Sequence, residues 1–333
     1  MSDHGRRHRC AAVALVALAT VGCGSPSPSA PPAASVAPAG SVAASLLVQS
    51  PATTSVPSAA SPSAPAGSDA SGTIGTRSGK RTYLLHLPPA STRLRPTPVV
   101  VAFHGWPMTT TRMANITHLA AVADAHGFAV LFPQGIGDSW SVPGGLPTPA
   151  QQAGVDDVAF VHALLDTVGP KFKLDTSRAV ATGISNGGHF AQALGCALAD
   201  HLAGVVTVAA PLPIGNPRGC KPSRPLSILD IVGTDDQPPS TFEDTLAFWA
   251  RTDKCPGGAV RSFLPDVAHD RTSVAISTFQ DCSKRTEVTG YLITGGGHAW
   301  PGGEALGSTE EFGVTSKQFD ASELIWTFLS RHT

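Results

Sequence analysis

The stretch AVATGISNGGHF, residues 179–190, is the part of this chain that says most about its fold. Its first five residues are small and mostly apolar, as in a strand buried on both faces, and an alanine-rich helical pattern follows from His189. Between the two, residues 183–187 (GISNG) fit G-x-S-x-G, the pattern of a serine exposed on a sharp strand-to-helix turn. Small neighbours permit such a strained turn, so Ser185 is a candidate nucleophile.

Apolar strand patterns alternate with helical patterns on both sides of this stretch. Strands are expected over residues 82–87, 98–103, 128–132, 178–184, 203–209, 225–232 and 287–293, and helices over residues 110–126, 155–168, 186–199, 242–251 and 319–331. Asp156 is a plausible N-cap of the second helix. This alternation predicts an α/β fold, with a mostly parallel central sheet and helices on both faces. Functional groups of such sheets gather beyond the carboxyl ends of the strands.

A serine hydroxyl needs a general base, and the base needs an orienting carboxylate. Two loops provide candidates, in the order Ser, acid, His that a serine on such a turn requires. GTDD at 233–236 follows one predicted strand, and either Asp235 or Asp236 is placed to be the acid; we favour Asp236. GGGH at 295–298 follows another predicted strand, which makes His298 the candidate base.

The loop HGW at 104–106 directly follows the apolar strand PVVVAF. Its backbone N–H at Trp106, together with the N–H of Asn186, is expected to form an oxyanion hole. We assign no chemistry to the side chain of His104. Trp106, Trp140 and Trp300 lie near these motifs, and we predict that they bind substrate as an aromatic platform, with packing in the cleft wall as the alternative.

Five segments together resemble the polyhydroxybutyrate depolymerase and feruloyl esterase branch of carbohydrate esterase family 1. They are HGW at 104–106, GVDDVAF at 154–160, GISNGG at 183–188, GTDD at 233–236 and GGGHAWPGG at 295–303. The resemblance runs from about residue 82 to the C-terminus. It implies an α/β-hydrolase fold and hydrolysis of carboxylic esters without a metal or an organic cofactor. It also implies Ser185 as nucleophile, Asp236 as acid and His298 as base.

The first 72 residues indicate export. A basic start and an apolar run over 11–21 predict a signal peptide over 1–22, and the residues before Cys23 resemble a lipobox. Cys23 is therefore the expected lipidation site; a plain secretory signal or an uncleaved anchor is the alternative. Residues 23–72, rich in Ala, Pro and Ser, predict a disordered tether, and 73–333 a single catalytic domain. We expect the protein at the outer face of the cell membrane, held by lipid only, or secreted.

Four cysteines remain beyond the predicted signal, and four cysteines in an exported chain suggest two disulfides with three possible connectivities. We expect the sequential pairing, Cys196–Cys220 and Cys255–Cys282. None of the four has the spacing of metal ligands, so no metal is expected. The formal net charge is -1 and 14% of residues are charged. Because no basic stripe is present, no nucleic-acid partner is expected.

The expected partner is thus an ester, on a polymer or polysaccharide in one version of the hypothesis, with a short-acyl, hydroxyacyl or hydroxycinnamoyl group. Two other functions remain open at this point. An envelope acyltransferase would use the same residues to pass the acyl group to a sugar. A non-catalytic surface binding lipoprotein would carry the same motifs without turnover. The sequence names neither the acyl group nor the alcohol.

Overall fold

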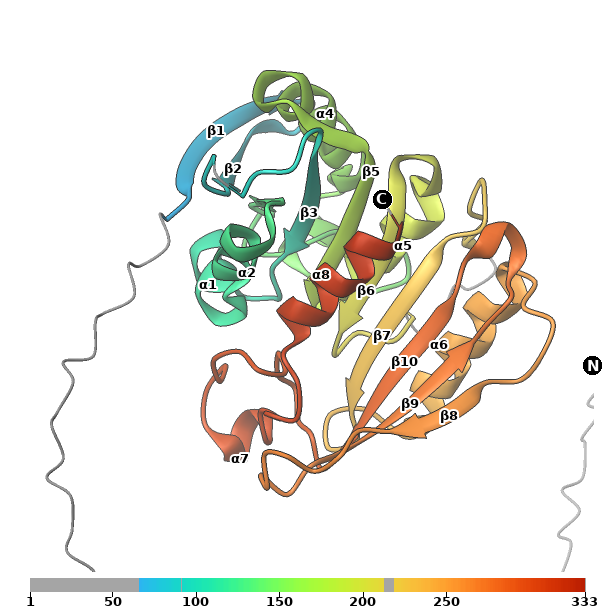
Figure 1. The fold of residues 1–333 in the computed structure, drawn as a ribbon. Helices are drawn as coiled ribbons and strands as arrows, with labels where there is room; N and C mark the ends of the chain where they lie inside the picture. Colours follow the sequence, from blue (N-terminus) through green and yellow to red (C-terminus); the bar gives the residue numbers. More distant parts are fainter. Residues whose placement is uncertain (1–65, 91, 213–218, 333) are drawn as a thin grey trace, which may run out of the picture. The chain divides into compact units, whose positions relative to one another are not determined.

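The structure is a computed structural model that describes residues 66–90, 92–212 and 219–332. The predicted signal peptide, Cys23 and most of the predicted tether lie outside the described residues. The described chain folds around one sheet in the order β1-β2-β4-β3-β5-β6-β7-β10-β9-β8 (Figure 1). The strands are β1 (Ser68–Thr76), β2 (Gly79–Leu87), β3 (Thr97–Phe103), β4 (Ala129–Pro133), β5 (Leu174–Ile184), β6 (Leu202–Val208), β7 (Ser227–Gly233), β8 (Val260–Phe263), β9 (Ser273–Phe279) and β10 (Val288–Thr294).

Strands β4, β3, β5, β6, β7 and β10 pair in parallel, whereas β1 and β2 at one edge and β9 and β8 at the other pair antiparallel. The expected mostly parallel α/β sheet is therefore confirmed. The helices are α1 (Thr110–Thr117), α2 (Leu119–His126), α3 (Pro149–Gln152), α4 (Asp157–Phe172), α5 (Asn186–Ala197), α6 (Pro239–Thr252), α7 (Thr309–Phe312) and α8 (Ala321–His332), with short 3₁₀ turns η1 (Ala199–His201) and η3 (Ser283–Arg285).

Two hydrophobic cores lie on opposite faces of the sheet. Alternation along β3 sends Val99, Val101 and Phe103 into the core that α4, α5 and α6 cover. Val100 and Ala102 point into the core under α1, α2 and α8. A strand buried on both faces reads as a continuous apolar run, which is why PVVVAF is recognisable in the sequence.

Three sequence expectations need correction. The helix expected over 110–126 is two helices, because His118 takes the left-handed conformation (φ 53°) between them. The tether expected to reach residue 72 ends earlier, because residues from Ser68 onward pair with β2. Strands β1, β8 and β9, which were not expected, extend both edges of the sheet.

The chain reverses its direction of travel across the sheet between β3 and β5. After β3 it moves outward to β4, whereas after β5 it continues through β6 and β7 to β10. The carboxyl ends of β3 and β5 are paired neighbours, with Phe103 opposite Gly183. Crevices at such switch points are where α/β sheets place their ligands. Here the switch brings residue 104 and residue 185 to the same place.

Two disulfides join Cys196 to Cys220 and Cys255 to Cys282, the sequential pairing. Cys196 lies at the end of α5 and Cys255 follows α6, while Cys220 and Cys282 precede β7 and β10. All four therefore lie toward the amino ends of the parallel strands. No helix among the described residues combines the length and apolar character needed to cross a bilayer.

Candidate active site

Ser185 occupies the single residue between β5 and α5, with φ 56° and ψ -127°. A positive φ is unusual for a residue with a side chain and is held only when the surroundings impose it. Glycines on both sides make the turn possible. A Cβ on Gly183 would lie 2.5 Å from the backbone of Gly187, and one on Gly187 would lie 2.2 Å from the carbonyl oxygen of Phe103. The Ser185 N–H donates to the carbonyl of Val208 at 3.0 Å, which ties the turn to β6.

His298 and Asp236 come together from the loops after β10 and β7, which are paired strands. His298 Nδ1 lies 2.9 Å from Asp236 Oδ1. The two loops are joined by backbone, since the Asp235 N–H donates to the carbonyl of Gly296 at 2.9 Å. The Asp236 side chain is 10% exposed, while Asp235 is exposed to solvent. Of the two candidate acids, the geometry places Asp236 at the histidine.

The loop after β3 passes directly beside the serine. A Cβ on Gly105 would lie 3.4 Å from Ser185 Cβ. The buried ring of His104 holds this loop, with Nδ1 2.8 Å from the carbonyl oxygen of Gly105 and Nε2 accepting from the Gly135 N–H at 2.9 Å. Burial lowers the pKa of His104 to about 4, so the ring is neutral and suits this donor and acceptor arrangement. Its role in the fold is to fix the loop that carries the Trp106 N–H.

Asn186 begins α5, where the first backbone N–H groups have no partner within the helix. Its side chain is bound to the backbone of Trp140 at both ends: Oδ1 accepts from the Trp140 N–H at 2.7 Å, and Nδ2 donates to the Trp140 carbonyl at 3.1 Å. This pair of hydrogen bonds fixes the orientation of the residue whose N–H is the second expected oxyanion donor.

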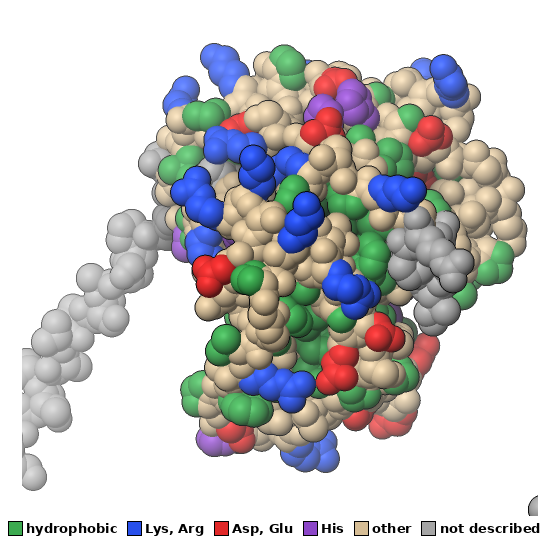
Figure 2. Space-filling model, turned by 90° about the vertical axis from the view of Figure 1, so that its right-hand side faces the viewer, with side chains coloured by type: hydrophobic (Ala, Val, Ile, Leu, Met, Phe, Trp, Pro, Cys, Tyr) green, Lys and Arg blue, Asp and Glu red, His purple; other side chains and the backbone are tan. Residues whose placement is uncertain are grey.

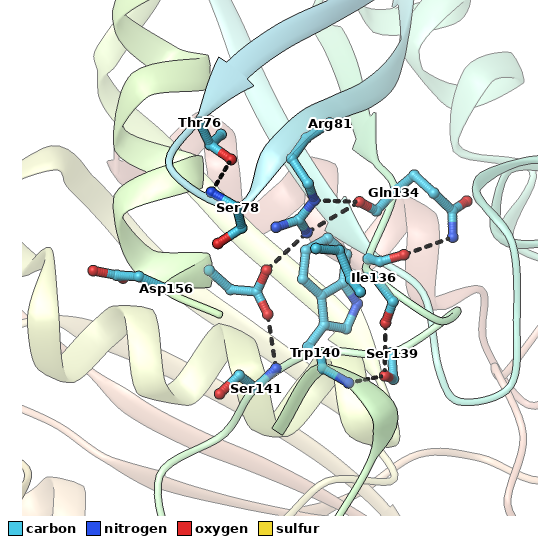
Figure 3. Close-up of polar contacts among 12 residues, drawn as sticks. Thr76, Ser78, Arg81, Gln134, Ile136, Ser139, Trp140, Ser141 and Asp156 are labelled. Atoms are coloured by element: carbon cyan, nitrogen blue, oxygen red, sulfur yellow. Dashed lines mark hydrogen bonds and ion pairs between the residues drawn. The ribbon is translucent and has the colours of Figure 1, made fainter. Parts of the chain in front are cut away.

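A buried ion pair, which could not be predicted from the sequence, holds the segment that carries Trp140. Arg81 of β2 and Asp157 of α4 are 3% and 2% exposed, and Arg81 Nη2 lies 2.7 Å from Asp157 Oδ1. Asp157 Oδ2 accepts from the Ser141 N–H at 2.8 Å. Figure 3 shows Arg81 reaching past Trp140 between Gln134 and the segment that carries Ser141. Burial raises the pKa of Asp157, against the lowering effect of the Ser141 N–H and of Arg81.

The sequence contained part of this signal. The motif GVDDVAF contains both Asp156 and Asp157, and the expected N-cap is confirmed: Asp156 caps α4 and accepts from the Ala159 N–H at 2.9 Å. Asp157 instead turns inward to Arg81. Because its partner stands 76 positions earlier in the chain, no local pattern could reveal the pair.

Ser185, Asn186 and His298 line one pocket of about 400 Å³. Its remaining lining residues are mostly apolar or glycine: Trp106, Val142, Gly144, Gly145, Leu146, His189, Ala209, Pro211, Leu212 and Gln237. Of the three predicted substrate-binding tryptophans, only Trp106 lines it, with a side chain 44% exposed. The prediction is wrong for the other two, which are fully buried. Trp140 stacks on Phe190 and Trp300 donates to Ser322 at 3.1 Å.

Within the described residues, no cluster of three or more His, Cys, Asp or Glu side chains is arranged to hold a metal ion. On the face drawn in Figure 2, basic and acidic side chains stand among hydrophobic and neutral ones.

The sheet, with a pocket at its carboxyl edge, has clear likenesses among known proteins. Residues 81–215 match the family model described as esterase PHB depolymerase. A protein named "Putative esterase NocK" from Nocardia uniformis subsp. tsuyamanensis is 28% identical over 279 residues, covering 75% of this chain and 79% of that protein. Feruloyl esterase B of Piromyces equi is 26% identical over 242 residues, covering 66% of this chain but only 42% of that enzyme.

Among solved structures, the acetyl xylan esterase from Aspergillus awamori superposes with a TM-score of 0.51 at 15% identity, covering 69% of this chain and 94% of that one. At this identity the likeness bears on the fold alone. Fold and relatives together define a carboxylic ester hydrolase with the α/β-hydrolase fold. Within that class, residues 81–215 are similar to the esterase PHB depolymerase family.

Proposed function

We propose that the protein hydrolyses carboxylic esters through an acyl-enzyme on Ser185. The observation that supports this most is that the three candidate residues meet beside one pocket although they come from three separate loops. Ser185 and His298 face the same pocket, and His298 Nδ1 is hydrogen-bonded to Asp236. With Nδ1 engaged by the carboxylate, His298 is left with Nε2 to take a proton from the serine hydroxyl.

The proposed reaction has two halves. His298 Nε2 accepts the Ser185 proton as Oγ attacks the ester carbonyl, and the carbonyl oxygen becomes an oxyanion that accepts from the N–H groups of Trp106 and Asn186. His298 then returns the proton to the departing alcohol, leaving the acyl group on Ser185. In the second half water replaces the alcohol: His298 takes a proton from the water as its oxygen attacks the acyl carbon. His298 then returns that proton to Ser185 Oγ as the acyl–oxygen bond to Ser185 breaks, and the free acid leaves. Asp236 holds the histidine ring and stabilises its cationic form throughout.

The pocket and the relatives support a proposed substrate class. A mostly apolar pocket of about 400 Å³ suits a short aliphatic or aromatic acyl group. Relatives bear the names feruloyl esterase B and bifunctional acetylxylan esterase/xylanase. We therefore propose short-acyl, hydroxyacyl or hydroxycinnamoyl esters as substrates, with a polysaccharide or another polymer as one source of the alcohol.

The test is hydrolysis of p-nitrophenyl acetate, p-nitrophenyl butyrate, methyl ferulate and a hydroxybutyrate oligomer by the purified protein and by Ser185→Ala. The variant is expected to lose at least about 10⁴-fold in kcat, because it lacks the nucleophile. Labelling with a serine-directed phosphonate, mapped by peptide mass, should occur at Ser185 only. An absence of both turnover and labelling would overturn the proposal. A product that forms only when a sugar acceptor is added would favour acyl transfer.

We also propose that the mature protein is exported and anchored by lipid on Cys23. Two disulfides are typical of oxidising compartments outside the cytosol. Metabolic labelling with a clickable fatty acid should mark the wild type and not Cys23→Ala, which should also leave the membrane fraction. Equal labelling of the two proteins would contradict the proposal.

A further inference from the structure

A second histidine lies in the same pocket and has no place in the mechanism above. His189 stands four residues after Ser185 on α5, and its N–H donates to the Ser185 carbonyl at 2.9 Å. Because residues four apart share one face of a helix, its side chain projects on the same side as the nucleophile turn. Its ring lines the pocket together with Ser185 and His298.

One nitrogen of the His189 ring has no partner in the protein. Nδ1 is buried and has no hydrogen-bond partner, and the residue lines the pocket. Burial lowers the pKa of His189 to about 4, and nearby His298 lowers it further, while the carbonyl of Pro211 and the carboxylate of Asp236 raise it. The ring is therefore neutral at neutral pH, with one nitrogen as donor and the other as acceptor.

Two other polar side chains of the pocket, Asn186 and Gln237, contact other groups of the protein. Asn186 uses both ends of its amide on the Trp140 backbone, and Gln237 Nε2 lies 3.5 Å from Asp236 Oδ1. The rest of the lining, apart from Trp106 and the catalytic candidates, is apolar or glycine. Among the residues that line this pocket, His189 is the one with a buried side-chain atom that has no hydrogen-bond partner. A polar atom left unpaired in an apolar pocket penalises any substrate that cannot pair with it.

We infer that His189 recognises a hydroxyl group of the substrate close to the scissile ester. A hydroxyl both donates and accepts, so it can pair with the unpartnered ring nitrogen whichever tautomer is present. The inference deepens the proposed function and rests on it. The hydroxyl belongs either to the acyl group or to the alcohol, and the chemistry of recognition is the same for both.

The test compares matched esters, using kcat/KM ratios so that any general loss of activity in a variant cancels. The acyl arm is ethyl 3-hydroxybutanoate against ethyl butanoate, and the alcohol arm is 2-hydroxyethyl butanoate against propyl butanoate. Each ratio is divided by the ratio of the alkaline hydrolysis rates. Wild type is expected to favour the hydroxylated ester about tenfold in one arm, the value of one hydrogen bond that the other ester leaves unmade. The arm that shows the preference identifies the source of the hydroxyl.

The variants are His189→Leu, His189→Gln and, as the matched control, Gln237→Leu. His189→Leu should bring the ratio close to one, His189→Gln should retain part of it because an amide donates and accepts, and Gln237→Leu should leave it unchanged. A wild-type enzyme that hydrolyses all four esters without preference overturns the inference and leaves the proposed function standing, whether or not any variant folds. A preference that survives in His189→Leu, or that falls in Gln237→Leu instead, also overturns it. Failure of the wild type to hydrolyse any ester overturns both.

Discussion

Replacing Asp157 by alanine should unfold this protein far more easily than its position on a helix suggests. The substitution leaves the guanidinium of Arg81, 3% exposed, without its carboxylate, and removes the acceptor of the Ser141 N–H. Breaking a buried ion pair from one side costs roughly 3–5 kcal/mol, because an uncompensated charge stays buried. We take about 4 kcal/mol as the expected fall in the free energy of unfolding. For a domain of this size that lowers Tm by roughly 8 °C.

The matched control is Asp156→Ala, one position earlier. Asp156 is exposed and only caps α4, so its loss should cost about 1 kcal/mol. Replacing both members of the pair with apolar residues, Arg81→Met with Asp157→Leu, should recover much of the loss, because no charge is then left buried. Urea unfolding followed by circular dichroism measures all four proteins. The reasoning fails if Asp157→Ala is no less stable than Asp156→Ala, or if the double variant is less stable than Asp157→Ala.

Three further outcomes are expected. Burial raises the pKa of Asp230 to about 7, so between about pH 4 and about pH 7 this side chain is protonated in the folded state and ionised in the unfolded state. The free energy of unfolding of the wild type therefore falls as the pH rises from about 4 to about 7. Asp230→Asn should lack this fall, which amounts to at most about 4 kcal/mol; parallel pH profiles for the two proteins would be a contradiction. Asp236→Asn should lower kcat about 10⁴-fold while Asp235→Asn changes it little, and equal losses in steady-state assays would refute the assignment of the acid. Replacing Cys196 and Cys220 by serine should lower the free energy of unfolding by about 3 kcal/mol yet leave kcat at low temperature unchanged, as calorimetry and rate assays would show.

The sequence was informative wherever burial imposes a pattern. The six parallel strands contain near-continuous apolar runs, and each run was predicted to within a few residues; the polar first part of β5, residues 174–177, was not. The strands at the edges lack that signature. All four residues of β8 are exposed, and in β1 only Ile74 is buried, so neither has a hydrophobic face to detect. The break between α1 and α2 at His118 also gives no signal in the sequence, because no glycine or proline marks the left-handed residue.

At the site, residues that sit on strand ends were predictable and residues that act across space were not. Ser185, Asp236 and His298 each follow a recognisable strand. The positions of the tryptophan side chains could not be predicted, because a tryptophan close to a motif in sequence can either pack in the core or line a pocket. Trp140 packs inward, where its backbone positions Asn186. Arg81 and Asp157 meet only in the folded chain.

The two disulfides lie at the end of the sheet away from the pocket, where β7 and β10 begin. The covalent cross-links and the loops that line the pocket are thus at opposite ends of the same strands. Mutations that reshape the pocket in the loops after β3, β4, β6 and β7 need not disturb the cross-linked end. Such a protein can change the shape of its pocket over evolutionary time, one loop at a time, while its resistance to unfolding is maintained from the other end of the sheet.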